Sequence, residues 1–408
     1  MKILNFGSCN IDYVYSLAHI ARAGETLHAN GFNIFPGGKG LNQSIALARA
    51  GSFVYHAGCV GVDGTLLTDI LKDNGVDISF IKKVREKNGH AVIQVAADGE
   101  NSIFINSGSN TMITKTDVDN TLSHFEKDDI ILLQNEISNL EYIVNRAYEK
   151  EMCIVLNPSP INETIFKLNF NMLSYIMINE VEAKAISGFD DIEESLEFFK
   201  TNYPALRVII TLGKNGCVYQ GENEIIYHPI YEVTAVDTTA AGDTFTGYFV
   251  SSVSRGDSIA NALKRASCAS AITVSRSGAA TSIPVSSEVD KLIDSLNVKK
   301  IDFDSNRLMR RVEKCITDNI SSVTLSDISD ELGYSTVYTG SLIKKLTGFS
   351  FKEYLHKKRV AFAAEQLRDT NAPISEIIQK CGYRNEGYFR KLFKEKYKVN
   401  PLEYRKRR

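Results

Sequence analysis

The first 294 residues alternate between short apolar runs and longer stretches in which apolar residues recur at helical spacing. Five of the runs are rich in branched apolar residues and predict buried strands: KILNFG, IILLQNE, CIVLNPSP, YIMINE and RVIITLG. Strands that alternate with helices are typical of a doubly wound α/β fold with a mostly parallel sheet. The sequence therefore predicts such a sheet for this part of the chain.

One segment departs from the alternation. Residues 89–106 (GHAVIQVAADGENSIFIN) contain two runs of period two around an Asp-Gly pair. Asp-Gly between alternating apolar positions predicts an antiparallel hairpin. We expect this hairpin to form a small flap over a site.

From Arg307 onward the pattern is helical and contains a weak repeat. ISDELGYS (328–335) and IIQKCGYR (377–384) each predict a short helix and a glycine turn, and a second helix follows each copy. Thr324, with an acid three residues later, predicts the start of the first copy. Residues 351–369 predict a long helix between the copies, and residues 386–397 predict the last long helix. This arrangement is typical of a double helix-turn-helix, whose second helices enter DNA major grooves.

Charge divides the 408-residue chain in two. Residues 1–296 carry 23 Lys/Arg and 35 Asp/Glu, whereas residues 297–408 carry 24 and 14. An acidic α/β domain at 1–296 is therefore expected, then a polar linker at 297–306 and a basic all-α domain at 307–408. The basic domain is the candidate for binding nucleic acid.

The N-terminus and the cysteines narrow the classes further. Residues 1–16 have one Lys and no long apolar run, so they predict a buried first strand rather than a signal peptide or membrane span. A cytoplasmic protein is expected. The seven cysteines lack the short spacings of zinc or redox pairs and are interpreted as core thiols.

The stretch DTTAAGDTF (237–245) places small residues and an acid before an apolar helical run. Ala240, Ala241 and Gly242 would let an anion approach the free N–H groups of a helix N-terminus. Asp243 would repel that anion unless it takes a proton from an attacking hydroxyl, so it is a candidate general base. A simple helix cap is the alternative.

A second glycine-rich stretch, FPGGKGLNQSIALARAG (35–51), precedes an amphipathic helix and is not a Walker A loop. Together the two stretches resemble the paired signatures of the ribokinase-like (PfkB) sugar kinases, and the resemblance extends in order over about the first 290 residues. It implies the ribokinase-like fold. Taken alone, Lys39 could be a surface lysine and Glu136 a solvated acid at a strand end.

The resemblance implies roles residue by residue. Asp243 would be the catalytic base, beside an anion hole of Ala240, Ala241 and Gly242. Residues implied to bind the sugar are Asn10, Asp12, Gly38, Lys39, Asn42, Glu136 and Asp243. Residues implied to bind ATP are Asn179, Thr211, Gly213, Gly216, Gly242 and Ser267.

Two metal sites are also implied. Asn179 and Glu182 would hold Mg²⁺ through water. The residues implied to surround K⁺ are Asp237, Thr239, Thr273, Arg276, Gly278 and Ser282. Two departures from the family pattern concern the nucleotide and the flap: Ser267 stands where an Asn is usual, and residues 88–90 lack the usual Thr.

The C-terminal segment resembles the DNA-binding domain of AraC/XylS-type regulators, with the later signature at GYRNEGYFRKLFKEKYKVNPLEYR (382–405). The positions implied to face DNA bases are Val337, Gly340, Ser341, Glu386, Gly387, Arg390 and Lys391. A basic helical bundle that contacts proteins is the alternative.

The two resemblances together imply a bifunctional chain. It would phosphorylate a sugar, with D-ribose to ribose 5-phosphate expected, using ATP, Mg²⁺ and K⁺, and would regulate transcription by binding double-stranded DNA, as a homodimer paired through its flap. One alternative is a regulator whose kinase-like domain only senses sugar, sugar phosphate or nucleotide. The intact Asp243 and anion hole favour retained catalysis. A tail that only oligomerises is disfavoured by its basic charge.

Overall fold

The computed structural model describes residues 1–96, 98, 100–231, 233–298, 305–332, 334–370, 372–383 and 385–406. The chain forms two compact units, Met1–Val298 and Lys299–Arg408. The linker predicted at 297–306 lies at this division, but residues 299–304 fall outside the described part of the chain. The limits of the linker therefore stay a prediction.

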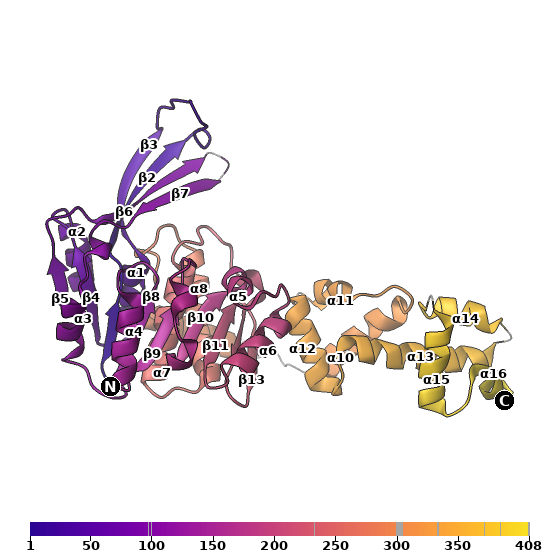
Figure 1. The fold of residues 1–408 in the computed structure, drawn as a ribbon. Coiled ribbons are helices and arrows are strands. Elements are labelled where there is room, and N and C mark those ends of the chain that lie inside the picture. The colour runs from indigo at the N-terminus through magenta and orange to yellow at the C-terminus, as the bar shows by residue number, and fades with distance from the viewer. Residues whose placement is uncertain are drawn as a thin grey trace. The chain divides into compact units, whose positions relative to one another are not determined.

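The first unit is built around a nine-stranded sheet (Figure 1). Its pairs are parallel except at one edge, where two antiparallel pairs extend it. This confirms the mostly parallel α/β fold. In sheet order the strands are β13 (Ile225–His228), β12 (Cys217–Gln220), β11 (Arg207–Thr211), β10 (Tyr175–Asn179), β9 (Cys153–Asn157), β8 (Ile130–Gln134), β1 (Ile3–Phe6), β4 (Val54–Val60) and β5 (Asp77–Lys83).

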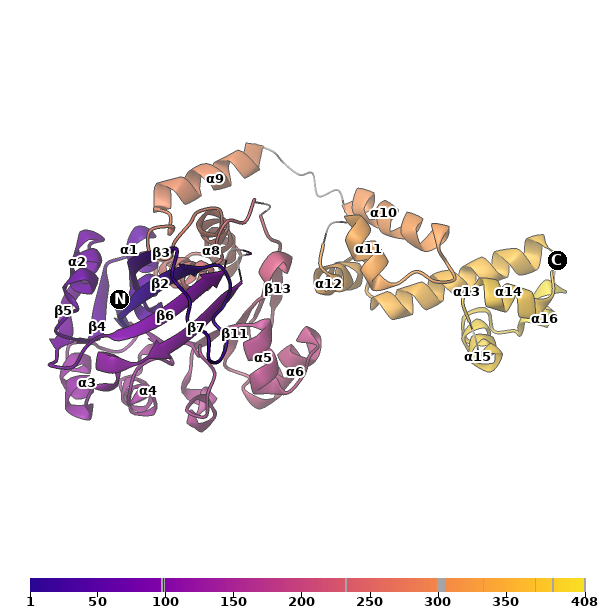
Figure 2. The same cartoon turned by 90° about the horizontal axis from the view of Figure 1, so that it is seen from above.

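Helices cover both faces of this sheet, as the view from above shows (Figure 2). One face packs against α1 (Lys39–Arg49), α7 (Ala241–Ser254) and α8 (Ile259–Val274), and their side chains share one core with inward residues of the central strands. Burial on both faces explains why these strands are continuously apolar. The other face carries α3 (Lys115–Leu122), α4 (Leu140–Glu149), α5 (Glu180–Ser187) and α6 (Ile192–Asn202). The unit also contains α2 (Thr65–Asp73) and α9 (Ser286–Val298).

A four-stranded flap projects from the body of this unit (Figure 1). The predicted hairpin is present as an antiparallel pair, although Gly99 of its turn lies outside the described residues. A second antiparallel pair joins it through one parallel pairing. In order the strands are β3 (Gly31–Gly37), β2 (Asn10–Leu17), β6 (Gly89–Ala96) and β7 (Asn101–Asn106).

The expected single first strand is two strands in different sheets. The amide of Gly7 donates to the carbonyl of Ala57 in the main sheet, while Asn10 already pairs with residues of the flap. The chain therefore crosses from β1 to β2 within three residues. This crossing brings the base of the flap to the end of β1.

The second unit is all helical, as predicted. It has two small hydrophobic cores, one packed on the first half and one on the second half of the long helix α13 (Phe351–Asp369). Thr324 and Asp327 form the expected reciprocal cap, with the amide of Asp327 3.2 Å from the Thr324 hydroxyl. The helices are α10 (Ser305–Asp318), α11 (Leu325–Leu332), α12 (Thr336–Thr347), α13 (Phe351–Asp369), α14 (Ile374–Lys380), α15 (Glu386–Tyr397) and α16 (Pro401–Arg405).

Two expectations from composition can be compared with these elements. All seven cysteines are free, and five of them are buried, which agrees with core thiols. Across the described part of the chain, no helix combines the length and the apolar character that a membrane span requires.

Candidate active site and nucleic-acid interface

The carboxyl ends of five neighbouring parallel strands meet at one edge of the main sheet. In open α/β sheets ligands bind at this edge. Polar side chains stand at or just beyond the ends of β1, β8, β9, β10 and β11, namely Ser8, Glu136, Asn157, Asn179 and Thr211. The strands predicted from sequence therefore gather the candidate residues by their parallel order.

Two glycines bring helix α1 against the end of β1. Gly38 has φ of 95°, and a Cβ built there would lie 2.9 Å from the backbone nitrogen of Asn10. A Cβ on Gly40 would lie 2.3 Å from the nitrogen of Ser8. Because only glycine permits both the conformation and the approach, α1 begins inside the site.

The N-terminus of α7 closes the opposite side of the site. Ala240 precedes the helix with φ of 60°, a conformation that non-glycine residues rarely adopt, and no side chain caps the helix. A Cβ on Gly242 would meet nothing within 4 Å, so the space beside its backbone is open. The anion hole predicted here stays a prediction, and the uncapped helix start and the open space are compatible with it.

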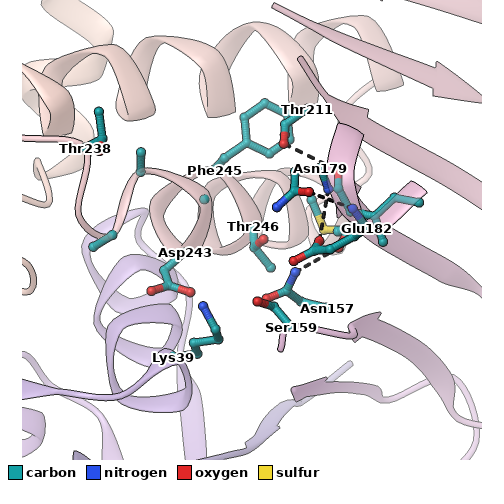
Figure 3. A pocket seen from close by; sticks show the side chains of 15 residues that line it. Lys39, Asn157, Ser159, Asn179, Glu182, Thr211, Thr238, Asp243, Phe245 and Thr246 are labelled. Carbon is teal, nitrogen blue, oxygen red and sulfur yellow. Dashed lines mark hydrogen bonds between the residues drawn. The ribbon is translucent and has the colours of Figure 1, made fainter. Parts of the chain in front are cut away.

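Between these elements lies a pocket of about 250 Å³ (Figure 3). Lys39 and Asp243 extend toward one another on one side, and Asn179 and Glu182 stand on the other. The pocket joins predicted sugar, phosphoryl and metal residues in one space. Its lining is Lys39, Asn157, Ser159, Met177, Ile178, Asn179, Glu182, Thr211, Thr238, Ala240, Ala241, Gly242, Asp243, Phe245 and Thr246.

Asp243 is 8% exposed, and two amides of α1 fix its carboxylate. Asn42 Nδ2 donates to Oδ2 at 3.0 Å, and Gln43 Nε2 donates to Oδ1 at 2.9 Å. The Asn42 carbonyl oxygen is buried and has no hydrogen-bond partner among the residues that the structure describes. Buried polar atoms normally have partners, so this oxygen suits a hydroxyl of the substrate.

The other predicted sugar residues form a second network at the base of the flap. Glu136 accepts hydrogen bonds from the Ser8 hydroxyl and, at 3.2 Å, from the Lys39 backbone amide. The Asn10 side-chain oxygen accepts from Asn110 Nδ2 at 2.7 Å. Of the sugar residues, only Lys39 and Asp243 line the pocket, and Asn42 and Glu136 are hydrogen-bonded to them. Asn10, Asp12 and Gly38 lie outside the lining.

Burial and charge perturb three ionisable groups of the site. Burial, and then the charges of Glu136 and Asp243, raise the pKa of Asp12 to about 7. Burial also raises the pKa of Glu136, against the opposing effect of Lys39. Burial disfavours the Lys39 ammonium, but the surrounding carboxylates outweigh burial and raise its pKa. The site thus holds one cation among several acids, which is suited to a polar, hydroxyl-rich ligand beside phosphate.

Asn179 and Glu182 form a reciprocal cap at the start of α5. The Glu182 amide donates to Asn179 Oδ1 at 2.9 Å, and the Asn179 amide donates to Glu182 Oε2 at 3.0 Å. Both residues line the pocket and supply oxygen atoms, the ligand type that Mg²⁺ prefers. Across the described residues, no group of three or more His, Cys, Asp and Glu side chains is arranged to hold a metal ion.

The predicted nucleotide residues are only partly gathered. Thr211 lines the pocket, and Gly213 and Gly216 follow it around a 3₁₀ turn at Gly213–Asn215. Both glycines have positive φ. Ser267 does not line the pocket; it is buried on α8, with its hydroxyl 3.8 Å from the sulfur of Cys217.

The residues predicted for K⁺ come together from two loops and the end of α8. Asp237 accepts hydrogen bonds from the amides of Thr239 and Gly278 at 2.9 and 3.0 Å. Burial favours the neutral acid of Asp237, but the Thr239 side chain and these two amides outweigh burial and lower its pKa. Other side chains of this set already bond within the protein. The Thr273 and Ser282 hydroxyls donate to backbone carbonyl oxygens, and Arg276 forms an ion pair with Glu288 at 2.5 Å. Backbone carbonyls are therefore the candidate K⁺ ligands here.

Sequence reasoning missed several polar residues of the site. Gln43 and Gln134 are fully buried beneath it, Asn110 orients Asn10, and Asn157 and Ser159 line the pocket. Gln43 follows Asn42 in the glycine-rich stretch, and Asn157 and Ser159 end a predicted strand. These positions in the sequence were the only indication that the three residues belong to the site.

The residues predicted to face DNA lie on α12 and α15. Ser335 and Asn385 cap these helices, accepting from the amides three residues later at 3.0 Å. Buried residues such as Thr339 and Phe389 fix the inner faces. On the outer faces Val337, Gly340 and Ser341 are partly exposed, and Glu386, Gly387, Arg390 and Lys391 are exposed. Arg390 pairs with Glu386 at 3.3 Å.

Comparisons with known proteins agree with both units. Residues 1–286 match the family model of pfkB family carbohydrate kinases, and residues 328–407 match a helix-turn-helix domain. Ribokinase of Bacillus subtilis (strain 168) is 34% identical over 296 residues, which are 72% of this chain and 99% of that protein.

Solved structures give the same result. Ribokinase from Cryptococcus neoformans in complex with ADP is similar with a TM-score of 0.63 and 33% identity, over 71% of this chain and 99% of that one. Arabidopsis thaliana ribokinase complexed with ribose and ATP gives a TM-score of 0.64 and 27% identity, over 71% of this chain and 98% of that one.

Fold and sequence together define a sugar kinase domain followed by an AraC-type helix-turn-helix domain. The chain belongs to the pfkB family of carbohydrate kinases, and its first domain is ribokinase-like. It is an ATP-dependent carbohydrate kinase.

The raised pKa of Asp12 gives a prediction for Asp12→Asn. The folded chain holds this proton up to about pH 7 whereas the usual Asp pKa is 3.8, so stability contributed by Asp12 falls as pH rises through this window. Removing the charge should raise the Tm of the kinase domain by about 2–4 °C at pH 8, with a smaller gain at pH 5. Scanning calorimetry measures both, with the exposed Asp69→Asn as control. An equal change at the two pH values would contradict the assignment.

Proposed function

We propose that the first domain transfers the γ-phosphoryl group of ATP to the primary hydroxyl of D-ribose, giving ribose 5-phosphate. The observation that carries this proposal is the Asp243 carboxylate, which two amides hold at the edge of a polar pocket beside an uncapped helix N-terminus. A carboxylate has about four lone-pair positions, so those not used by Asn42 and Gln43 can accept a hydroxyl proton.

The remaining residues complete a phosphoryl-transfer site. The backbone N–H groups at Ala241 and Gly242 would stabilise charge on the transferred group, and Lys39 would attract it. The free oxygen of Asn42, with Asp12 and Glu136, would orient the sugar hydroxyls. Mg²⁺ would neutralise charge on the ATP phosphates, with Asn179 and Glu182 as its water-mediated holders. K⁺ would take carbonyl oxygens beside Asp237.

We also propose that the chain is a homodimer paired through its flap. Tyr13, Ile34, Val92 and Phe104 are cross-strand partners, so they share the flap face opposite Asp12. On this face Ile34 is 50% exposed and Phe104 57% exposed. A second copy of the chain would cover these apolar side chains.

The second domain, we propose, binds a specific DNA site and regulates transcription in the cytoplasm in response to the sugar. Three observations support this: the net charge of the domain is positive, α12 and α15 are capped and have exposed outer faces, and the domain follows the kinase domain in the sequence. The alternative of a kinase-like domain that only senses its ligand predicts no turnover. The arrangement around Asp243 favours turnover over sensing alone.

The role of Asp243 predicts the effect of Asp243→Asn. An amide cannot take the hydroxyl proton, so kcat with D-ribose and ATP should fall by about 10²–10⁴-fold, while sugar affinity changes little. A coupled assay of ADP formation and sugar titration by calorimetry measure these quantities. Wild-type turnover in the variant would refute the base assignment, and no turnover in the wild type would favour the sensor.

Flap pairing predicts that Phe104→Asp yields monomers. A charge on the covered face would have to be buried without a partner in the dimer. Sedimentation velocity should show a dimer for the wild type and a monomer for the variant. Phe166→Asp is the matched control, because Phe166 is 58% exposed and lies outside the flap. A monomeric wild type, or a dimeric Phe104→Asp, contradicts the proposal.

DNA recognition predicts a loss of affinity in Arg390→Ala. An Arg that contacts a base edge contributes about 1–3 kcal/mol, so affinity for a site selected from random duplexes should fall about 5- to 150-fold. Fluorescence anisotropy with the full chain measures this, with Arg368→Ala on α13 removing the same charge elsewhere. Binding should weaken linearly in a plot of log affinity against log salt. Equal losses in both variants, or no salt-sensitive binding, would overturn the proposal.

A further inference from the structure

Beneath the active site a chain of buried side chains leads away from Asp243. Gln43 donates from Nε2 to Asp243 Oδ1 at 2.9 Å and to Asn157 Oδ1 at 3.1 Å. Its own carbonyl oxygen accepts from Gln134 Nε2 at 2.6 Å. Both N–H groups and the oxygen of the Gln43 amide therefore have partners.

These partners permit one orientation of the Gln43 amide. Asn157 donates its Nδ2 to the carbonyl of Met177 at 2.8 Å, so its Oδ1 faces Gln43 as an acceptor. A flipped Gln43 would place its oxygen against two acceptor oxygens, those of Asn157 and Asp243. Repulsion of those oxygens excludes the flip.

The chain is anchored deep in the domain. Gln134 also donates to Asn5 Oδ1 at 2.9 Å, and Asn5 donates to the Ser44 hydroxyl at 2.8 Å. Ser44 contacts His56 Nδ1 at 2.8 Å. Burial lowers the pKa of His56 to about 4, so at neutral pH its Nδ1 can accept from Ser44. Side chains that are fully buried and bonded at both ends cannot readily move.

We propose that Gln43 is a positioning residue for the transfer reaction, which holds the Asp243 carboxylate so that its free lone pairs face the attacking hydroxyl. This inference rests on the proposed role of Asp243 as the base. Gln43 is fully buried and does not line the pocket, so it acts through Asp243 and not on the substrate. Asn42 holds the other oxygen, and the two amides together fix the plane of the carboxylate.

The roles of the two amides differ. Asn42 keeps a buried oxygen that bonds to none of the described residues, whereas every polar atom of the Gln43 side chain has a partner. Loss of Asn42 should therefore affect both sugar binding and turnover. Loss of Gln43 should affect turnover alone, because a base displaced by about 1 Å can reduce a rate by about 10²-fold without changing the contacts that bind substrate.

The test is Gln43→Met in the full chain, which keeps the length of the side chain and removes its donors. We expect kcat with D-ribose and ATP to fall about 10- to 100-fold, with both KM values within about threefold of wild type. Gln43→Asn keeps an amide but shortens its reach, and should give a smaller fall in kcat. Because Gln43→Asn retains a polar group in the buried network, its kcat can still be measured if Gln43→Met does not fold.

Gln220→Met is the matched control for a structural effect. Gln220 is a buried glutamine of β12 whose Nε2 donates to the carbonyl of Leu196 at 3.0 Å, away from the pocket. It should lower Tm but leave kcat unchanged, and calorimetric titration of ATP should give the same number of sites in all variants.

Three outcomes would overturn the inference. One is wild-type kcat in both Gln43 variants alongside a defective Asp243→Asn, which leaves the proposed function standing. Another is an equal fall of kcat in Gln220→Met. Absence of turnover in the wild type would remove the proposed function and this inference together.

Discussion

The active site depends on two hydrogen bonds, which the side-chain amides of Asn42 and Gln43 on α1 donate to the Asp243 carboxylate. They join residues at least 200 positions apart, the start of α1 and the start of α7. Both helices pack on the same face of the sheet and share its core. The position of the proposed base is thus set by the packing of the domain, because the two amides hold its carboxylate at a defined place in the first turn of α7.

The sequence predicted those parts of the fold that depend on local pattern. The five strands named from sequence are confirmed because a strand buried on both faces is a continuous apolar run. β4 was not named, since its run includes His56 and Gly58, which interrupt the apolar signal. The pairing of β2 with β3 was also missed. These strands belong to a flap in which apolar residues such as Phe32 and Ile34 are exposed, so buried apolar and exposed polar residues do not alternate along them.

The residues of the candidate site were also predicted only in part. Family motifs placed Lys39, Asn179, Glu182 and the Ala240–Asp243 turn, and the structure brings these to one pocket. Gln43 could not be assigned, because its role depends on contacts with Asn157, Gln134 and Asp243 that only the folded sheet creates. The raised pKa of Asp12 likewise depends on the folded chain, since it arises from burial and then from Glu136 and Asp243, which are distant in sequence.

The chain joins a sugar kinase domain to a helix-turn-helix domain, and the central claim is that the candidate site around Asp243 catalyses phosphoryl transfer. ³¹P NMR of the full chain with D-ribose, ATP, Mg²⁺ and K⁺ tests this most directly. Transfer to the primary hydroxyl should give ADP and a new phosphomonoester signal, which the two protons on the adjoining carbon split into a triplet. ATP that stays intact, or an ester signal split by one proton, would contradict this prediction.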